Sequence, residues 1–333
     1  MRSTRFAMIC CFAFVAGFAA RGGAAPSIAQ LGAQLGLDAD EIARVQKGEV
    51  VHGSRSELSE RDLAVGFVLF AKAPPATLAQ GFRRADDLAN DPSIVASHRI
   101  ARVGAANDLA SLQLRPRGAD EAKRYLAAQP GDTLNLSDAE LAAFHGLGAA
   151  ATQDAVTAQL RKLLLVRHDS YRTRGIAGIA PYAREGGQRR ELGEGLRVLA
   201  QPPPGLERYV PAVRALLHGY PKLPPGAEET YYWLLYDHDD RPTVSLRHRM
   251  TLAIDGSYFI ADREFFVSQG YNELQGLAAL MPVEGGTLIL YRADTSTDRV
   301  SGTGSTMKHS IGRRMMAKQL QEIFERTRNK LAK

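Results

Sequence analysis

Cysteine is nearly absent from this 333-residue chain, and both copies, Cys10 and Cys11, lie close to the amino terminus. The rest of the chain therefore cannot form a disulfide, offers no thiol nucleophile and supplies no thiolate to a metal. Long hydrophobic runs are equally scarce, because only the segment from Phe6 to Ala20 is almost wholly apolar. That segment is shorter than the run of about 20 residues that a membrane-spanning helix needs.

The first 25 residues have the three parts of a secretory signal. Arg2 and Arg5 provide a basic start, the apolar run follows, and small residues close the segment at 22–25. This order predicts cleavage near Ala24 or Ala25 and a periplasmic or secreted protein that consists of about residues 26–333. A retained membrane anchor is the alternative interpretation.

A strong charge imbalance is also missing. The chain has 42 Lys and Arg against 36 Asp and Glu, a net charge of +6, and loss of three signal arginines would reduce it to about +3. Basic residues gather only in short pairs such as Arg83-Arg84, so we expect no nucleic acid partner. The Gly302-x-Gly304 sequence lacks the third glycine of a dinucleotide-binding loop, and we expect no cofactor.

The order of hydrophobic patterns predicts an α+β fold in which helices cover an antiparallel sheet within a single domain. Strands are predicted at 62–71, 94–102, 108–114 and, as a strand-rich region, 229–294. Helical spacing predicts a helix at 76–88 and a largely helical region that we interpret as an insertion at 115–225. The segment Tyr271–Leu280 has the composition of an extra helix before the last strand.

Residues 305–331 have the pattern of a long amphipathic helix. Its basic side carries residues such as Lys308, Arg313 and Lys318. Its apolar stripe comprises Met307, Ile311, Met315, Met316, Leu320, Ile323, Phe324 and Leu331. We expect this stripe to pack on the sheet. A peripheral membrane contact through the basic side is the alternative.

One hairpin can be derived in register. Apolar and polar residues alternate from Thr243 to Ile254, and Asp255-Gly256 then predicts a two-residue type I′ turn, so that the numbers of paired residues sum to 511. On one face this register pairs opposite charges, Arg247 with Glu264 and Arg249 with Asp262. On the other face it predicts the apolar pairs Leu252–Phe259, Met250–Ala261 and Leu246–Phe265. A slip by one residue would destroy both patterns.

The same register places His248 opposite Arg263 in the middle of the apolar face. A buried guanidinium needs a partner, because burial of an unpaired charge is costly. In one interpretation a carboxylate from a covering helix pairs with Arg263, and His248 is a hydrogen-bonded core residue. In the other, the two side chains bind an anionic head group at the polar end of a cavity. The apolar tail of the ligand then lies over Leu246, Met250, Phe259 and Phe265.

Two further clusters have the residue types of chemical sites. Ser301, Ser305 and His309, with Asp294 and Asp298, could supply a Ser-His-Asp hydrolase, although no Gly-x-Ser-x-Gly motif occurs. We interpret Ser305 instead as the cap of the last helix. The segment 237–240, Asp-His-Asp-Asp, could bind a metal, but it is typical of a solvated turn between strands, and we predict no metal site.

The arrangement resembles the helix-grip fold of START-like lipid-binding domains, in which a long carboxy-terminal helix closes over a curved antiparallel sheet. Strand 62–71, helix 76–88, the 229–294 sheet and helix 305–331 match those parts, whereas the helical insertion does not. Motifs in the last third, including Arg263-Glu-Phe-Phe-Val and Pro282-x-Glu-Gly-Gly-Thr287, are similar to a family of exported bacterial proteins without an assigned function.

These observations favour an exported, non-catalytic binding or carrier protein whose partner is an amphiphilic small molecule or lipid-like anion. A hydrolase that uses Ser305 or Ser301 with His309 is the enzymatic alternative. An envelope protein that binds other proteins and holds no ligand is the third hypothesis.

Overall fold

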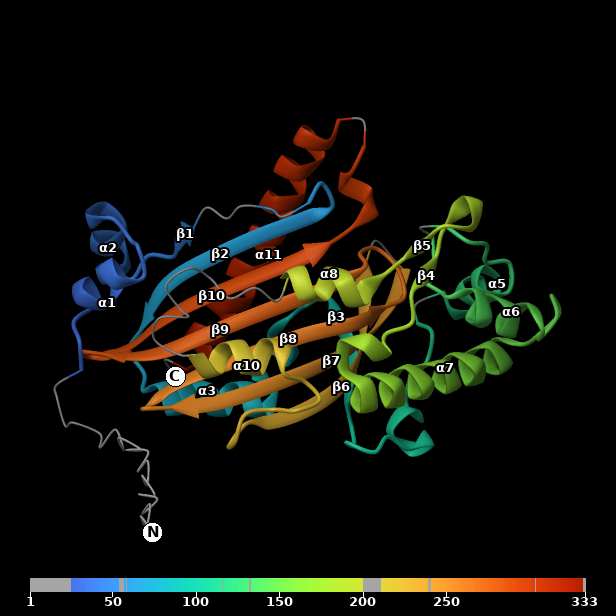
Figure 1. The fold of residues 1–333 in the computed structure, drawn as a ribbon, viewed down its shortest axis with the longest axis horizontal. Helices are drawn as coiled ribbons and strands as arrows, with labels where there is room; N and C mark the ends of the chain where they lie inside the picture. The colour runs from blue at the N-terminus through green and yellow to red at the C-terminus, as the bar shows by residue number, and fades with distance from the viewer. Residues whose placement is uncertain are drawn as a thin grey trace, which may run out of the picture.

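The computed structural model describes residues 25–53, 57, 59–115, 117–131, 133–199, 211–238, 241–302 and 304–331. The predicted signal therefore lies, apart from Ala25, outside the described residues. Within the described part the fold is α+β, as predicted, with a large antiparallel sheet and a long carboxy-terminal helix (Figure 1). No helix in these ranges is both long and apolar enough to cross a bilayer.

Eight strands form the main sheet, and every neighbouring pair in it is antiparallel. Their order across the sheet is β1 (Val51–Gly53), β2 (Asp62–Ala71), β10 (Gly286–Ser296), β9 (Glu273–Val283), β8 (Ser257–Val267), β7 (Arg241–Ile254), β6 (Glu228–His238) and β3 (Ile94–Ile100). A separate two-stranded ribbon pairs β4 (Tyr182–Ala183) with β5 (Arg189–Arg190). The early strand β2 forms a long-range pair with the last strand, β10, and β1 is the edge strand beyond β2.

The α-helices of the described ranges are α1 (Ile28–Gln34), α2 (Ala39–Gln46), α3 (Pro75–Arg84), α4 (Asp86–Asn90), α5 (Gly118–Leu126), α6 (Asp138–His145), α7 (Gln153–Arg174), α8 (Leu192–Leu199), α10 (Pro211–His218) and α11 (Ser305–Leu331). The predicted helix 76–88 is thus two helices. They meet at Ala85, whose left-handed backbone (φ 63°) ends α3. The predicted last helix is confirmed as α11.

Two sequence-based assignments are wrong. The segment predicted as a strand at 108–114 begins in a 3-10 turn, Ala106–Leu109, where the Asp108 carboxylate accepts backbone N–H groups of Ala101 and Ala105. The segment predicted as a helix at Tyr271–Leu280 lies instead mostly in strand β9. Alanine and leucine favour helix locally, but β9 pairs on both sides and is buried on both faces, and this tertiary context overrides the propensity.

The predicted hairpin is confirmed over most of its length. Every pair from Arg247–Glu264 to Ile254–Ser257 sums to 511, and the turn residues Asp255 (φ 47°) and Gly256 (φ 79°) both have the positive φ of a type I′ turn. The predicted Leu246–Phe265 pair is wrong, because Leu246 pairs with Phe266. Phe265 is an extra residue in β8, a β-bulge that shifts the register beyond this point.

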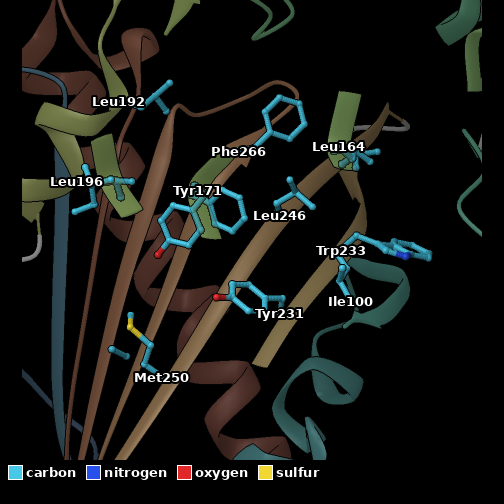
Figure 2. Packing of buried hydrophobic residues seen from close by; sticks show 14 of the residues in the cluster. Ile100, Leu164, Tyr171, Leu192, Leu196, Tyr231, Trp233, Leu246, Met250 and Phe266 are labelled. Atoms are coloured by element: carbon cyan, nitrogen blue, oxygen red, sulfur yellow. The ribbon is translucent and has the colours of Figure 1, made fainter. Parts of the chain in front are cut away.

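Helices cover both faces of the sheet. On one face α7, α8 and α10 pack over the larger hydrophobic cluster, and α8 and α10 lie in front of the strands in Figure 1. Figure 2 shows this cluster closely, and Tyr171, Leu246 and Phe266 are among its labelled side chains. On the opposite face α3 and α11 pack over a smaller cluster that contains Phe67, Leu78 and Ile289. On this face a cavity remains between the sheet and α11.

Candidate ligand cavity

A cavity of about 1120 Å³ lies between the sheet and α11. Side chains of β2, β6, β7, β8, β9 and β10 form its floor, α11 covers it, and α3 and α4 line another side. This volume is sufficient for a small lipid-like molecule, since typical ligand pockets measure about 300–1000 Å³. The cavity lies on the face of the hairpin that carries Arg247 and Asp262, the face predicted to be polar.

The deeper wall of the cavity is apolar. Leu69, Leu280 and Ile289 rise from the sheet, and Leu320 and Phe324 descend from α11. Phe324 makes an edge-to-face contact with Tyr291, with ring centroids 4.9 Å apart, and so holds α11 against the sheet. This wall can surround an apolar chain but offers it few hydrogen-bond partners.

A cluster of polar side chains that line the cavity surrounds Glu264, which lies behind them and does not line the cavity itself. Glu264 is fully buried, and its carboxylate accepts from Arg247 Nη2 (2.8 Å), from the Tyr236 hydroxyl (2.6 Å) and from the Tyr271 hydroxyl. Arg247, Tyr236 and Tyr271 all line the cavity. The bonds of Arg247 use Nε and Nη2, which leaves Nη1 without a bonded partner in the described part of the chain.

A second buried ion cluster ties α4 to the sheet. Arg249, only 2% exposed, donates to Asp262 (2.7 Å) and to Asp87 of α4 (2.6 Å). Burial raises the pKa of Asp262, but the charge and hydrogen bonds of Arg249 outweigh it and hold that pKa below its ordinary value. Both aspartates line the cavity, whereas Arg249 does not. Arg249 is neutralised by these aspartates, and Arg247, which does line the cavity, is neutralised by Glu264.

Four exposed residues that line the cavity, Arg299, Lys308, Ile311 and Met315, are called its mouth below, and the two cations among them lack such compensation. Arg299 follows β10 and Lys308 lies in the first turn of α11, and both are exposed. The Lys308 ammonium donates to the Ser301 carbonyl (3.1 Å), and neither cation forms an ion pair within the described ranges. Ile311 and Met315, both more than half exposed, border the same opening. The mouth is therefore basic and partly apolar.

The six residues predicted as a ligand site lie elsewhere. Each of them is at most 1% exposed, none lines this cavity, and they occupy the face beneath α7 and α10. They are His248, Arg263, Leu246, Met250, Phe259 and Phe265. His248 and Arg263 do face each other across the hairpin, as the register predicted. Ligand binding by this group stays a prediction.

The prediction that a carboxylate pairs with Arg263 is wrong, because its hydrogen-bond partners in the described structure are neutral groups. Its Nε donates to Gln275 (2.9 Å), its Nη1 to the hydroxyl of Tyr171 in α7 (3.3 Å), and its Nη2 to the carbonyl of Leu217 in α10 (2.6 Å). Within the described chain no carboxylate pairs with it. A head group could reach this guanidinium only by displacing one of the covering helices.

His248 belongs to the same buried network. Its Nδ1 lies 2.9 Å from the Tyr171 hydroxyl, and its Nε2 lies 3.2 Å from a carboxylate oxygen of Glu229. Burial lowers the pKa of His248 to about 4, although Glu229 counteracts this shift. The imidazole is therefore neutral at pH 7 and adds no positive charge to Arg263.

The residue types of a Ser-His-Asp site do not meet in the described structure. His309 Nδ1 lies 2.7 Å from Glu57, and its Nε2 lies 2.8 Å from the Glu60 carbonyl, so both ring nitrogens have partners other than serine. The Ser301 hydroxyl donates to the Asp298 carbonyl. No group of three potential metal ligands occurs in the described ranges, and Asp239 and Asp240 lie outside them.

The cavity lies on the face of the hairpin opposite to the one that carries the predicted ligand site. One feature of the sequence pointed to this face: the charged residues that alternate along β7 and β8 form a polar face within the sheet. A buried polar face of this kind can border a cavity. None of the protein families, curated proteins or solved structures compared with this chain matches it.

Proposed function

We propose that the chain is an exported, non-catalytic carrier for an amphiphilic, lipid-like anion, and that this ligand occupies the cavity beneath α11. One observation carries the proposal: a roomy cavity with an apolar wall and a basic mouth. An apolar chain gains about 25 cal/mol for each Å² that it removes from water, so such a wall favours a hydrophobic tail.

The proposed orientation follows from charge. Arg247 and Arg249 are compensated by Glu264, Asp262 and Asp87, and a second anion beside them would be repelled. Arg299 and Lys308 have no carboxylate partner in the described part. The anionic head group therefore binds at the mouth, and the tail extends toward Leu280 and Leu320.

We further propose a helix-grip-like architecture interrupted by an insertion. The support for it is that β3 and β6 are direct antiparallel neighbours, yet residues 101–227 separate them in the sequence. A connection of this length exceeds what adjacent antiparallel strands require. It includes the region 115–225 predicted as a helical insertion.

The first experiment tests whether the protein carries a ligand. Protein beginning at Pro26 is purified without detergent and extracted with organic solvent, and the extract is analysed by mass spectrometry. We expect a stoichiometric amphiphile, and a dansyl-labelled fatty acid should bind in its place after delipidation. An empty extract, together with no binding of the labelled fatty acid by folded protein, contradicts the carrier function and favours the protein-interaction hypothesis.

Replacing Leu274 with tryptophan is expected to weaken binding of the labelled fatty acid at least tenfold, because the indole would occupy part of the space that the ligand needs. Leu274 lines the cavity and is only partly buried, so the larger ring has space within it. Val95→Trp is the matched control, since Val95 also lies in a strand, is 51% exposed and does not line the cavity. Fluorescence titration gives both dissociation constants.

The same titration separates the two proposed sites. If Leu274→Trp binds normally while folded Arg263→Met and His248→Ala variants do not, the ligand lies at the His248–Arg263 pair and the cavity assignment is wrong. If Leu274→Trp alone loses binding, the ligand lies beneath α11.

A further inference from the structure

The first half of α11 exposes an unusual row of apolar side chains. Six large hydrophobic residues of the described chain are exposed, and three of them are Met307 (68%), Ile311 (52%) and Met315 (68%). They are four residues apart, so they form one row along a single face of the helix. The prediction that the whole apolar stripe packs on the sheet is therefore wrong at this end. Among the α11 side chains that the structure describes, Met316, Leu320 and Phe324, with Ala317, pack against the smaller cluster.

Basic residues flank this row. Between Ser305 and Gln321 the helix contains no Asp or Glu, and its four cations are Lys308, Arg313, Arg314 and Lys318. All four are exposed. Arg313 contacts Glu57 at 3.3 Å, and the other three form no ion pair in the described ranges. The surface thus combines exposed apolar side chains with uncompensated positive charge.

We propose that this half of α11 docks the protein on an anionic lipid surface. A helix with apolar residues on one side and lysine or arginine beside them binds parallel to a bilayer, with the apolar row in the interface. Each cation near such a surface is attracted by its negative potential. An acidic protein partner would satisfy the charges, but the apolar row consists of only three exposed side chains on one helix. A stable protein interface buries roughly 800 Å² on each partner, so the small row favours lipid.

The position of the row connects docking with the cavity, and this step rests on the proposed function. Ile311, Met315 and Lys308 belong both to the exposed surface and to the cavity mouth. A bilayer on this surface would therefore adjoin the opening directly. An amphiphile could then move between membrane and cavity with its tail shielded from water.

The test is cosedimentation of the full mature chain with vesicles. One set contains phosphatidylglycerol with phosphatidylethanolamine, and the other contains phosphatidylcholine alone. We expect binding to the anionic vesicles, at least tenfold weaker binding to the neutral ones, and loss of binding in high salt. Absence of binding to the anionic vesicles, or equal binding to both sets, overturns the proposal.

A surface variant isolates the docking residues. Met307→Ser combined with Arg314→Glu and Lys318→Glu changes three exposed side chains, none of which lines the cavity. It should weaken binding to anionic vesicles at least tenfold. The control, Val95→Ser with Val103→Ser and Val166→Ser, removes the other three exposed hydrophobic residues and should bind as the natural sequence does. Equal vesicle binding by the surface variant and the natural sequence overturns the proposal.

The two proposals can fail separately. The surface variant should still bind the dansyl-labelled fatty acid in solution, and Leu274→Trp should still bind anionic vesicles. Vesicle binding without any fatty acid binding would support the docking surface and contradict the carrier function. Fatty acid binding without vesicle binding would support the carrier function and contradict the docking surface.

Discussion

Replacing Arg249 with methionine is expected to lower the free energy of unfolding by about 3–5 kcal/mol. Within the described ranges Arg249 is the ion-pair partner of both Asp262 and Asp87, and its loss leaves both carboxylates beside an uncharged side chain. Those two carboxylates are largely buried, with side chains 15% and 17% exposed. Urea unfolding followed by circular dichroism measures the change.

Arg189→Met is the matched control for this prediction. Arg189 also forms an arginine–aspartate pair, with Asp138, but both side chains are more than half exposed. Exposed pairs contribute about 0–1 kcal/mol, so the control should unfold close to the natural sequence. Similar losses in the two variants would show that burial of the Arg249 cluster contributes little.

A rescue variant tests the proposed cause. Adding Asp87→Asn and Asp262→Asn to Arg249→Met removes the two negative charges that the single variant leaves unpaired. Part of the lost stability should then return. The single variant should also bind the labelled fatty acid less well, because Asp87 lines the cavity and its bonds to Arg249 hold α4 in place.

Replacing Glu273 with glutamine is expected to stabilise the protein at neutral pH by an amount that grows between pH 5 and pH 8. Glu273 is fully buried beside α8, and neither of its carboxyl oxygens has a hydrogen-bond partner in the described structure. Burial raises the pKa of Glu273 to about 8, although Arg190 counteracts this shift.

The sign follows from proton linkage. Between about pH 4.5 and pH 8 the folded protein holds a proton on Glu273 that the unfolded chain has released. The free energy of unfolding therefore falls with rising pH, by up to about 1.4 kcal/mol per pH unit, and levels off above pH 8. Glutamine cannot ionise, so the free energy of unfolding of the variant does not fall with pH through this group.

Urea unfolding at pH 5, 6, 7 and 8 tests this dependence. Glu284→Gln is the control, because Glu284 is exposed in the β9–β10 turn. The stability difference between Glu273→Gln and the natural sequence should widen with pH, and the difference for the control should not. Parallel curves for all three proteins would rule out a buried neutral carboxyl group at position 273.

The sequence by itself determined those features that depend on neighbouring residues. Period-two alternation and the Asp-Gly turn fixed the register of β7 and β8 from Arg247 to Ile254. A slip by one residue would separate both the opposite-charge pairs on one face and the apolar pairs on the other. The amphipathic pattern of 305–331 likewise specified α11, and the α+β class followed from the order of such segments.

Only the tertiary structure decided how the two faces of the sheet are covered. Both faces of the hairpin are buried, so hydrophobicity could not show which face is packed solidly and which contains the cavity. Other features also depend on distant residues. Strand β9 forms because it pairs with β8 and β10, and Arg263 has neutral partners because α7 and α10 pack above it. The bulge at Phe265 is likewise not specified by the local pattern. Local pattern fixes which side of a strand a residue occupies, whereas the space above that side depends on helices far away in the sequence.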